Sequence, residues 1–165
     1  MTKLKIKKQN KKVVLELIDN EIFIKGPLGI LKIKSMNSSF LINEKKFYIN
    51  SKKLKSLSNE IKNIIYGVCN GWFVELNLNG IGFKCFKIDD KIALDLGYSN
   101  IVTFKNNDNI KIKNFKNRLI LFGIDKSSLT NVAHSIKRCS SIDRYKGKGI
   151  LFKDEKIKLK QKTMS

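Results

Sequence analysis

The stretch FYINSKKLKSLSNEIKNIIYGVCNGW, residues 47–72, changes its hydrophobic period part-way along its length. Its opening residues alternate apolar and polar side chains, which is the period of a strand. Its later apolar residues recur at i, i+4, i+7, i+8, i+11 and i+15, the spacing of one helix face. They are Leu57, Ile61, Ile64, Ile65, Val68 and Trp72. The stretch therefore predicts a strand followed by a helix, with Gly71 at the helix end.

The same pattern recurs in RLILFGIDKSSLTNVAHSIKR, residues 118–138. Phe47, Ile49 and Leu57 each align with a leucine that lies 72 residues later. Asp125 or Ser127 suits the N-cap of the second helix. The recurring unit predicts an α+β fold of two tandem similar small domains, each an antiparallel sheet packed with a helix. We place the domain boundary between residues 78 and 79. The apolar face of the second helix is Leu129, Val132, Ala133 and Ile136.

Short alternating runs separated by turn residues predict antiparallel strands elsewhere in the chain. Asp19-Asn20 predicts a two-residue hairpin turn, and the Gly26–Gly29 segment predicts a second hairpin. One long strand is expected from Phe73 to Ile88, with Asp89-Asp90 turning the chain back into residues 91–98. The other expected strands are residues 13–18, 21–25, 30–34, 40–42, 47–49, 101–105, 110–113 and 118–122.

The chain is strongly basic, because 34 lysine and arginine residues stand against 14 acidic residues and the net charge is +20. Self-repulsion of this size opposes folding unless a polyanion offsets it. Nucleic acid is the favoured partner, with an anionic membrane surface as the alternative. Only Arg118, Arg138 and Arg144 are arginines. Because lysine contacts phosphate as a point charge, we expect neutralisation of the nucleic-acid backbone to outweigh base reading.

Apolar patterning separates these two partners. No run of about 18 apolar residues is present, so no membrane-spanning helix is expected. Both predicted helices bury ordinary aliphatic faces, so we expect no membrane partner. The first twelve residues carry six lysines but match neither a signal peptide nor a transit peptide. We therefore expect the chain to be made where it works.

The segment Arg144-Tyr145-Lys146-Gly147-Lys148-Gly149-Ile150 alternates cations with glycines beside one aromatic residue. Glycines let the backbone approach a phosphate closely, and a tyrosine ring can stack on an unpaired base. The spacing does not match the phosphate-loop motif of nucleotide-binding proteins. The segment predicts an RNA contact, and the alternative is a glycine-rich turn with solvated lysines.

Two neighbouring features extend this candidate surface. Three lysines after the glycine segment alternate with apolar residues, and a strand there would align them on one face, with a solvated face as the alternative. On the second predicted helix, a histidine and an arginine lie one turn apart opposite the apolar face, flanked by a lysine. The only histidine lacks partners for catalysis or metal binding, so it is either RNA-facing or an idle surface residue. These candidates are His134, Lys137, Arg138, Lys156, Lys158 and Lys160.

No motif for catalysis or cofactor binding is present. Cys69, Cys85 and Cys139 are odd in number and far apart, so we expect buried structural thiols and neither a zinc site nor disulfides. The Gly26–Gly29 segment lies between two predicted strands, whereas the GXXG loop of a KH domain joins two helices. No carboxylate pair or Ser/His/Asp set stands out. We therefore expect no enzymatic activity, no cofactor, no metal and no small-molecule substrate.

Six motifs follow one another along the chain: IKGPLGIL at 24–31, GVCNGW at 67–72, LNGIGFK at 78–84, LDLGYS at 94–99, LFGIDK at 121–126 and YKGKGI at 145–150. In this order they resemble the bacterial-type large ribosomal subunit protein six family across nearly the whole chain. The resemblance implies two similar α+β domains, of which residues 79–165 form the rRNA-binding one. It also implies a structural constituent of the large subunit that binds rRNA near the sarcin–ricin loop and the stalk base. Its partners would be neighbouring large-subunit and stalk-base proteins, with translational GTPases nearby.

The resemblance assigns residues by position. Tyr145 to Gly149 match the rRNA-contacting segment of the family, and Lys137 with Arg138 match its basic helix end. Two departures stand out, because Asn100-Ile101 replaces a His-Pro pair and residues 140–144 replace a Pro-Glu-Pro segment. The second departure predicts a less rigid approach to the glycine segment.

The compartment and the partner leave alternatives open. Abundant Lys, Ile and Asn, whose codons are AT-rich, together with divergence and the lack of a presequence, resemble organelle-encoded members of the family. The expected location is the ribosome of the mitochondrial matrix, with a plastid or the cytoplasm of an AT-rich bacterium as alternatives. The alternative function is an RNA-binding module outside the ribosome.

Overall fold

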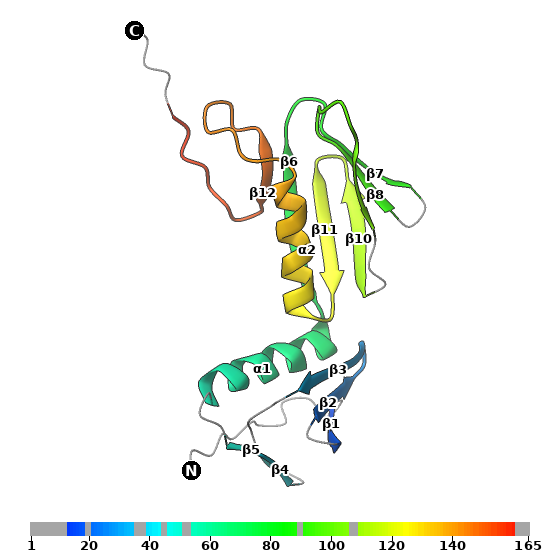
Figure 1. The fold of residues 1–165 in the computed structure, drawn as a ribbon, viewed down its shortest axis with the longest axis vertical. Coiled ribbons are helices and arrows are strands. Elements are labelled where there is room, and N and C mark those ends of the chain that lie inside the picture. The colour runs from blue at the N-terminus through cyan, green and yellow to red at the C-terminus, as the bar shows by residue number, and fades with distance from the viewer. Residues whose placement is uncertain are drawn as a thin grey trace. The chain divides into compact units, whose positions relative to one another are not determined.

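The computed structural model describes residues 13–18, 21–34, 39–43, 46–50, 54–88, 91–105 and 109–160. Its elements follow one order twice: a three-stranded meander, a two-stranded hairpin, a helix and one further strand. Figure 1 shows the two helices, α1 and α2, each beside strands of its own set. The second hairpin strand and the helix of the later set each begin 72 residues after their counterparts. This order confirms the predicted repeat and the α+β fold.

The bounds of the elements fall into the two sets. The first set is β1 (Val14–Ile18), β2 (Glu21–Gly26), β3 (Gly29–Lys34), β4 (Ser39–Asn43), β5 (Lys46–Asn50), α1 (Leu54–Asn70) and β6 (Trp72–Asn79). The second set is β7 (Lys84–Ile88), β8 (Lys91–Asp95), β9 (Val102–Lys105), β10 (Ile110–Phe115), β11 (Arg118–Gly123), α2 (Lys126–Arg138) and β12 (Gly149–Phe152).

The chain divides into two compact units. One comprises residues up to Trp72 with residues 124–126, and the other comprises residues 73–123 with residues from 127 onward. Apart from its first residue, β6 belongs to the second unit, where it neighbours β11 and pairs antiparallel with β12. The boundary expected from the sequence, between residues 78 and 79, lies near the end of this strand.

In the first unit, α1 packs on the β1-β2-β3 sheet. The registers Ile18↔Glu21 and Gly26↔Gly29 pair β1 with β2 and β2 with β3, so both predicted pairs of antiparallel strands form. The predicted turn residues Asp19 and Asn20 lie outside the described residues. A Cβ at Gly26 would lie 2.2 Å from Val68 Cγ1, so the glycine permits close contact between the turn and α1. The buried core residues are Val13, Ile22, Ile24, Ile33, Ile61 and Val68. Each such aliphatic side chain contributes about 1.5–3 kcal/mol on burial.

The end of α1 corrects one expectation. The helix ends before Gly71, whose φ is +77°, a conformation that favours glycine. The apolar period assigns Trp72 to the helix face, but it is the first residue of β6. Its ring lies 4.5 Å from that of Tyr66, and its Nε1 donates a hydrogen bond to the Asn63 carbonyl at 3.1 Å. Trp72 therefore packs back against the helix from outside it.

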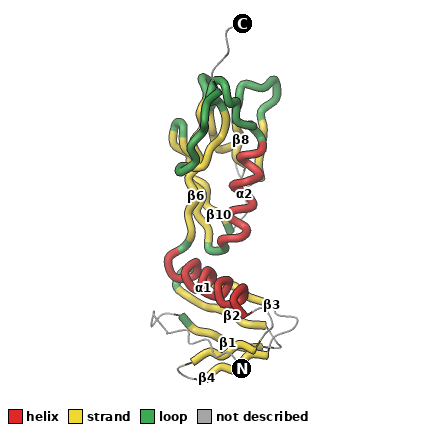
Figure 2. Tube along the Cα trace, turned by 90° about the vertical axis from the view of Figure 1, so that its left-hand side faces the viewer, coloured by secondary structure: helices red, strands yellow, loops and turns green. Residues whose placement is uncertain are grey.

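In the second unit, α2 lies along one side of the four-stranded sheet of order β10-β11-β6-β12, as Figure 2 shows. The predicted helix face is confirmed for three of its members, because Leu129, Ala133 and Ile136 are fully buried. Val132 is half-buried. The sheet contributes the fully buried Leu76, Leu78, Leu119, Leu121 and Ile150. The strands β7, β8 and β9 form a separate three-stranded sheet.

The single long strand expected from Phe73 to Ile88 is wrong. The chain forms β6 and β7, which belong to different sheets, with a turn at residues 80–83. Gly82 has a φ of +85°, and Phe83 N–H donates to the Gly80 carbonyl at 3.3 Å. A Cβ at Gly80 would meet the Phe83 ring at 2.7 Å. The two glycines therefore permit a tight turn where alternation of apolar residues suggested continuity.

Candidate nucleic-acid interface

The predicted glycine segment forms a tight turn between α2 and β12. Asp143 N–H donates to the Lys148 carbonyl, and Gly147 N–H donates back to the Asp143 carbonyl, each at 2.8 Å. The Asp143 carboxylate accepts a third bond from Tyr145 N–H at 2.8 Å. Gly147 has a φ of +68°, which a residue with a side chain rarely adopts. Asp143 thus organises the turn, although residues 140–144 contain none of the prolines that the family has there.

Glycine is also required at residue 149, the second glycine of the segment. A Cβ at Gly149 would lie 2.9 Å from Ile142 Cα, so the two arms of the turn touch backbone to backbone. This contact and the hydrogen bonds of Asp143 join residues 140–143 to the turn. The lower rigidity expected from the missing prolines stays a prediction. The predicted contact residues are presented outward: Arg144, Tyr145, Lys146 and Lys148 are all exposed.

The segment after β12, residues 153–160 and here called the tail, folds back on the same turn. Lys160 N–H donates to the Arg144 carbonyl at 2.9 Å. The strand considered for this segment is absent, because residues 155–160 belong to no strand. Lys156, Lys158 and Lys160 are nevertheless exposed, and Ile157 between them is half-buried. The turn and the tail therefore bring predicted cations from residues 144–148 and from residue 160 close together.

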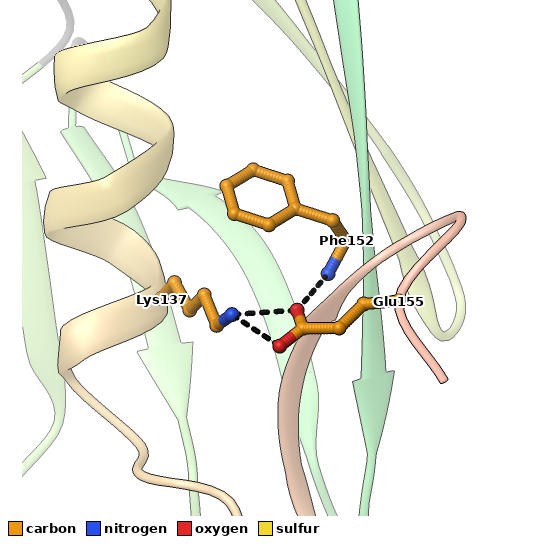
Figure 3. A network of polar contacts seen from close by, with 3 residues as sticks. All are labelled: Lys137, Phe152 and Glu155. Atoms are coloured by element: carbon orange, nitrogen blue, oxygen red, sulfur yellow. Dashed lines mark hydrogen bonds and ion pairs between the residues drawn. The ribbon is translucent and has the colours of Figure 1, made fainter. Parts of the chain in front are cut away.

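The helix residues of the predicted site behave differently from one another. His134 and Arg138 are exposed, but the His134 ring also packs edge-on against Phe152, with ring centroids 5.0 Å apart. Lys137 is half-buried and its Nζ contacts both carboxylate oxygens of Glu155, at 2.5 and 2.6 Å (Figure 3). The same carboxylate accepts a hydrogen bond from Phe152 N–H at 3.2 Å. Lys137 is thus engaged within the protein.

Ion pairs distinguish the cations that contact acids within the protein from those that remain available to a partner. The hydrogen bond from Lys137 lowers the pKa of Glu155 below its usual range, against a smaller opposing effect of burial. The hydrogen bond from Lys153 lowers the pKa of Glu75 in the same way. Six cations of the turn and tail take part in none of the ion pairs formed among the described residues. They are Arg144, Lys146, Lys148, Lys156, Lys158 and Lys160.

Sequence reasoning missed the two acids that organise this surface. By sequence alone, Asp143 is a loop residue and Glu155 is an opposing charge, whereas in the fold one closes the turn and the other fastens the tail to α2. The sequence offered only a weak signal: Asp154 and Glu155 are the only two acids between Arg144 and Lys160, and an acid among cations has a partner within reach. The partner it selects depends on the fold.

The cysteines give no sign of metal binding. Cys69, Cys85 and Cys139 are free and half-buried, rather than fully buried as expected. Burial raises the pKa of Cys85 to about 11 and raises that of Cys139. The described residues contain no group of three or more His, Cys, Asp or Glu side chains that could hold a metal ion. They also contain no helix long and apolar enough to cross a membrane.

Comparison with known proteins decides the family. Residues 80–153 match the family model described as ribosomal protein L6. The large ribosomal subunit protein uL6 of Metamycoplasma arthritidis is 33% identical over 94% of this chain and 92% of its own length. The chain belongs to the ribosomal protein L6 family. The uL6 protein of Caldicellulosiruptor saccharolyticus is 32% identical over 90% and 87% of the two chains, and uL6m of Reclinomonas americana is 31% identical over 92% and 91%.

Membership of the L6 family confirms the resemblance carried by the six motifs. L6 proteins are structural components of the large ribosomal subunit that bind its rRNA, and they are not enzymes. The match to the family model spans β7 to β12 and so includes α2 and the glycine turn. The three tail lysines at 156, 158 and 160 lie beyond the matched residues.

Proposed function

We propose that this protein binds large-subunit rRNA near the sarcin–ricin loop and the stalk base and supports the region where translational GTPases bind. Residues 79–165 form the rRNA-binding domain in this proposal, and neighbouring large-subunit and stalk-base proteins complete the surroundings. Family membership supports a ribosomal role over an RNA-binding module outside the ribosome.

The observation that carries the proposal is the geometry of the glycine turn. Asp143 holds the turn closed from inside, so its hydrogen bonds use backbone groups while the cationic side chains remain exposed. Gly147 has no Cβ, which lets phosphates approach the backbone of the turn, whereas the missing Cβ of Gly149 faces Ile142 inside the turn. A polyanion is the partner that this arrangement favours, since it offsets the charge of +20.

Roles follow from position and chemistry. Lysine and arginine side chains of the turn and tail neutralise phosphates, and the exposed ring of Tyr145 stacks on an unpaired base. Gly147 provides close backbone approach, and Gly149, which is buried against Ile142, keeps the turn in the shape that presents the cations. His134 and Arg138 extend the surface along α2, and Lys137 stands at its inner edge. The cationic contacts proposed are Arg138, Arg144, Lys146, Lys148, Lys156, Lys158 and Lys160.

The proposed compartment is the mitochondrial matrix. AT-rich codon usage in the composition favours an organelle genome, and uL6m of Reclinomonas americana, whose name marks a mitochondrial form, is among the similar proteins. The other similar proteins named above are bacterial, so a plastid or an AT-rich bacterium is the competing assignment. Fractionation of the source cells, with the protein followed by mass spectrometry, decides between them.

The test of the function reverses two charges on the turn. Lys146→Glu with Lys148→Glu is expected to block stable entry into large subunits, measured by sucrose-gradient sedimentation. Both side chains are exposed, so we expect the melting temperature to remain near that of the wild type. The matched control is Lys34→Glu with Lys62→Glu, two exposed lysines of the first unit. A turn variant that folds normally and enters subunits at wild-type levels would contradict the proposal.

A further inference from the structure

One face of the four-stranded sheet carries a second, unassigned surface. Because side chains alternate along a strand, the buried Leu119 and Leu121 place Arg118, Ile120 and Phe122 on the face opposite α2. On β10, the buried Ile110 likewise places Lys111, Lys113 and Phe115 there. The register pairs these residues across the strands as Lys111↔Phe122, Lys113↔Ile120 and Phe115↔Arg118. Aromatic and cationic side chains are thus interleaved on this face.

The β10–β11 half of the face is open to solvent. Lys111, Lys113 and Arg118 are exposed, and the ring of Phe115 is 56% exposed. Phe73, which shares the face on β6, is 69% exposed. The two rings lie near opposite ends of the face, because the β10–β11 turn is next to the end of β6. The exposed ring of Phe115 therefore offers a flat apolar surface among the cations of β10 and β11.

A hollow lies at the turn between β10 and β11. Its volume is about 660 Å³, and it is lined by Glu75, Phe115, Lys116, Asn117, Arg118 and Ile120. The one carboxylate in this lining, that of Glu75, pairs with Arg118 at 3.5 Å and with Lys153 at 2.9 Å. Its negative charge is therefore compensated within the protein, and the side chain of Arg118 stays 66% exposed. The rim remains cationic.

We propose that this free sheet face, defined as Lys111, Lys113, Phe115, Lys116 and Arg118, binds an unpaired RNA segment. A base stacks on the Phe115 ring in the hollow, and the flanking phosphates contact the lysines of β10 and the adjoining turn. Single-stranded RNA is bound in this manner by sheet faces that combine aromatic rings with cations. The inference rests on RNA being the partner of the protein, as proposed above, and adds a site on a different face from the glycine turn.

Charge decides between RNA and a protein partner. Two cations, Lys116 and Arg118, line the hollow, and its single acid is already paired. Lys111 and Lys113 add two more positive charges on the same face of β10. An ordinary protein partner would have to supply several carboxylates together with an apolar group for Phe115. An unpaired RNA segment supplies both a flat ring and regularly spaced negative charges.

The test uses the full chain and a fluorescently labelled oligo(A) of about eight nucleotides, within the range of about 4–16 that single-strand sites span. Phe115→Ala is expected to weaken binding about 5- to 150-fold in fluorescence anisotropy, as removal of one stacking platform does. Phe115→Tyr keeps the ring and should bind like wild type, whereas Phe115→Leu should bind like the alanine variant. Lys111→Gln with Lys113→Gln should reduce the magnitude of the salt slope by about 0.7 for each phosphate that is no longer neutralised.

The matched control is Tyr98→Ala, because Tyr98 is 54% exposed in the same unit but lies on another loop. Wild-type affinity in Phe115→Ala, or an equal weakening in Tyr98→Ala, would overturn the inference. The glycine-turn variant separates this result from the proposed function. If Phe115→Ala has no effect while the turn variant fails to enter subunits, only the sheet-face site is wrong. If Phe115→Ala weakens binding while the turn variant assembles normally, the turn proposal is wrong and the sheet-face site stands.

Discussion

The contact between Lys137 and Glu155 allows a quantitative prediction. Glu155→Gln removes the carboxylate that accepts from the Lys137 ammonium and from Phe152 N–H. The side chains of Lys137 and Glu155 are 24% and 31% exposed, so the pair lies between a surface ion pair and a buried one. Exposed pairs contribute about 0.2–1 kcal/mol, and breaking a buried pair costs about 3–5 kcal/mol. We expect a decrease of about 1–2 kcal/mol in the free energy of unfolding, or about 2–8 °C in Tm for a chain of 165 residues.

The pH dependence of this decrease has a definite sign. The folded protein holds the pKa of Glu155 below its ordinary value of 4.5. A carboxylate with a depressed pKa contributes stability that is present above the unfolded pKa and is lost as pH falls through the folded pKa. The difference between wild type and Glu155→Gln is therefore expected to be full at pH 7 and to shrink below about pH 4.5.

A double-mutant cycle is the assay. Urea unfolding of Lys137→Gln, Glu155→Gln and the double variant gives the coupling energy, which we expect to be about 1 kcal/mol or more. The control is Lys156→Gln, an exposed cation beside Glu155, with an expected change within about 0.5 kcal/mol. Additive single changes, or a difference that is unchanged at pH 3, would refute the reasoning.

The same variants separate an rRNA contact from a positioning role for Lys137. If Lys137 fastens the tail to α2, both single variants weaken rRNA binding to a similar extent and leave the salt slope unchanged. If Lys137 contacts a phosphate directly, Lys137→Gln lowers the magnitude of the slope by about 0.9, and Glu155→Gln does not. Salt titration of binding to transcribed large-subunit rRNA measures this slope.

Three further predictions concern packing and the thiols. Gly67→Ala should destabilise the first unit by about 2 kcal/mol in chemical unfolding, because its Cβ would lie 2.1 Å from the Ile124 carbonyl oxygen. Unchanged stability would contradict this and show that the backbone at Ile124 moves aside without cost. Leu129→Asp should unfold the second unit by burying an unpaired carboxylate, seen as reduced amide protection from residue 73 onward; retained protection would contradict this. Cys85, with a pKa of about 11, should react slowly with iodoacetamide at pH 8 in the folded protein and faster once unfolded, and equal rates would refute its burial.

Local features of this fold could be predicted from the sequence because they depend on residues that are neighbours along the chain. The period of the apolar residues identified α1 and α2. Their predicted faces are buried at Ile61 and Val68 on α1 and at Leu129 and Ile136 on α2. The two-residue turn between Gly26 and Gly29 sets the register of β2 and β3. The repeat at 72 residues revealed the doubled plan, because each half must bury its own helix face on its own strands. The cationic glycine segment was equally visible, since glycine and lysine are conspicuous as residue types.

What only the tertiary structure decided depends on residues far apart along the chain. Apolar alternation runs from Phe73 to Ile88, but β6 joins the sheet with β12 and β7 joins another, so the chain must turn at residues 80–83. Alternation indicates that one face of a strand is buried, but it does not indicate which other strand this strand pairs with. Glu155 acquired its partner in the same way, because Lys137 lies 18 residues away on a helix that faces β12. The open sheet face, too, exists only because α2 covers the opposite side, and burial of one face leaves the alternate residues to solvent.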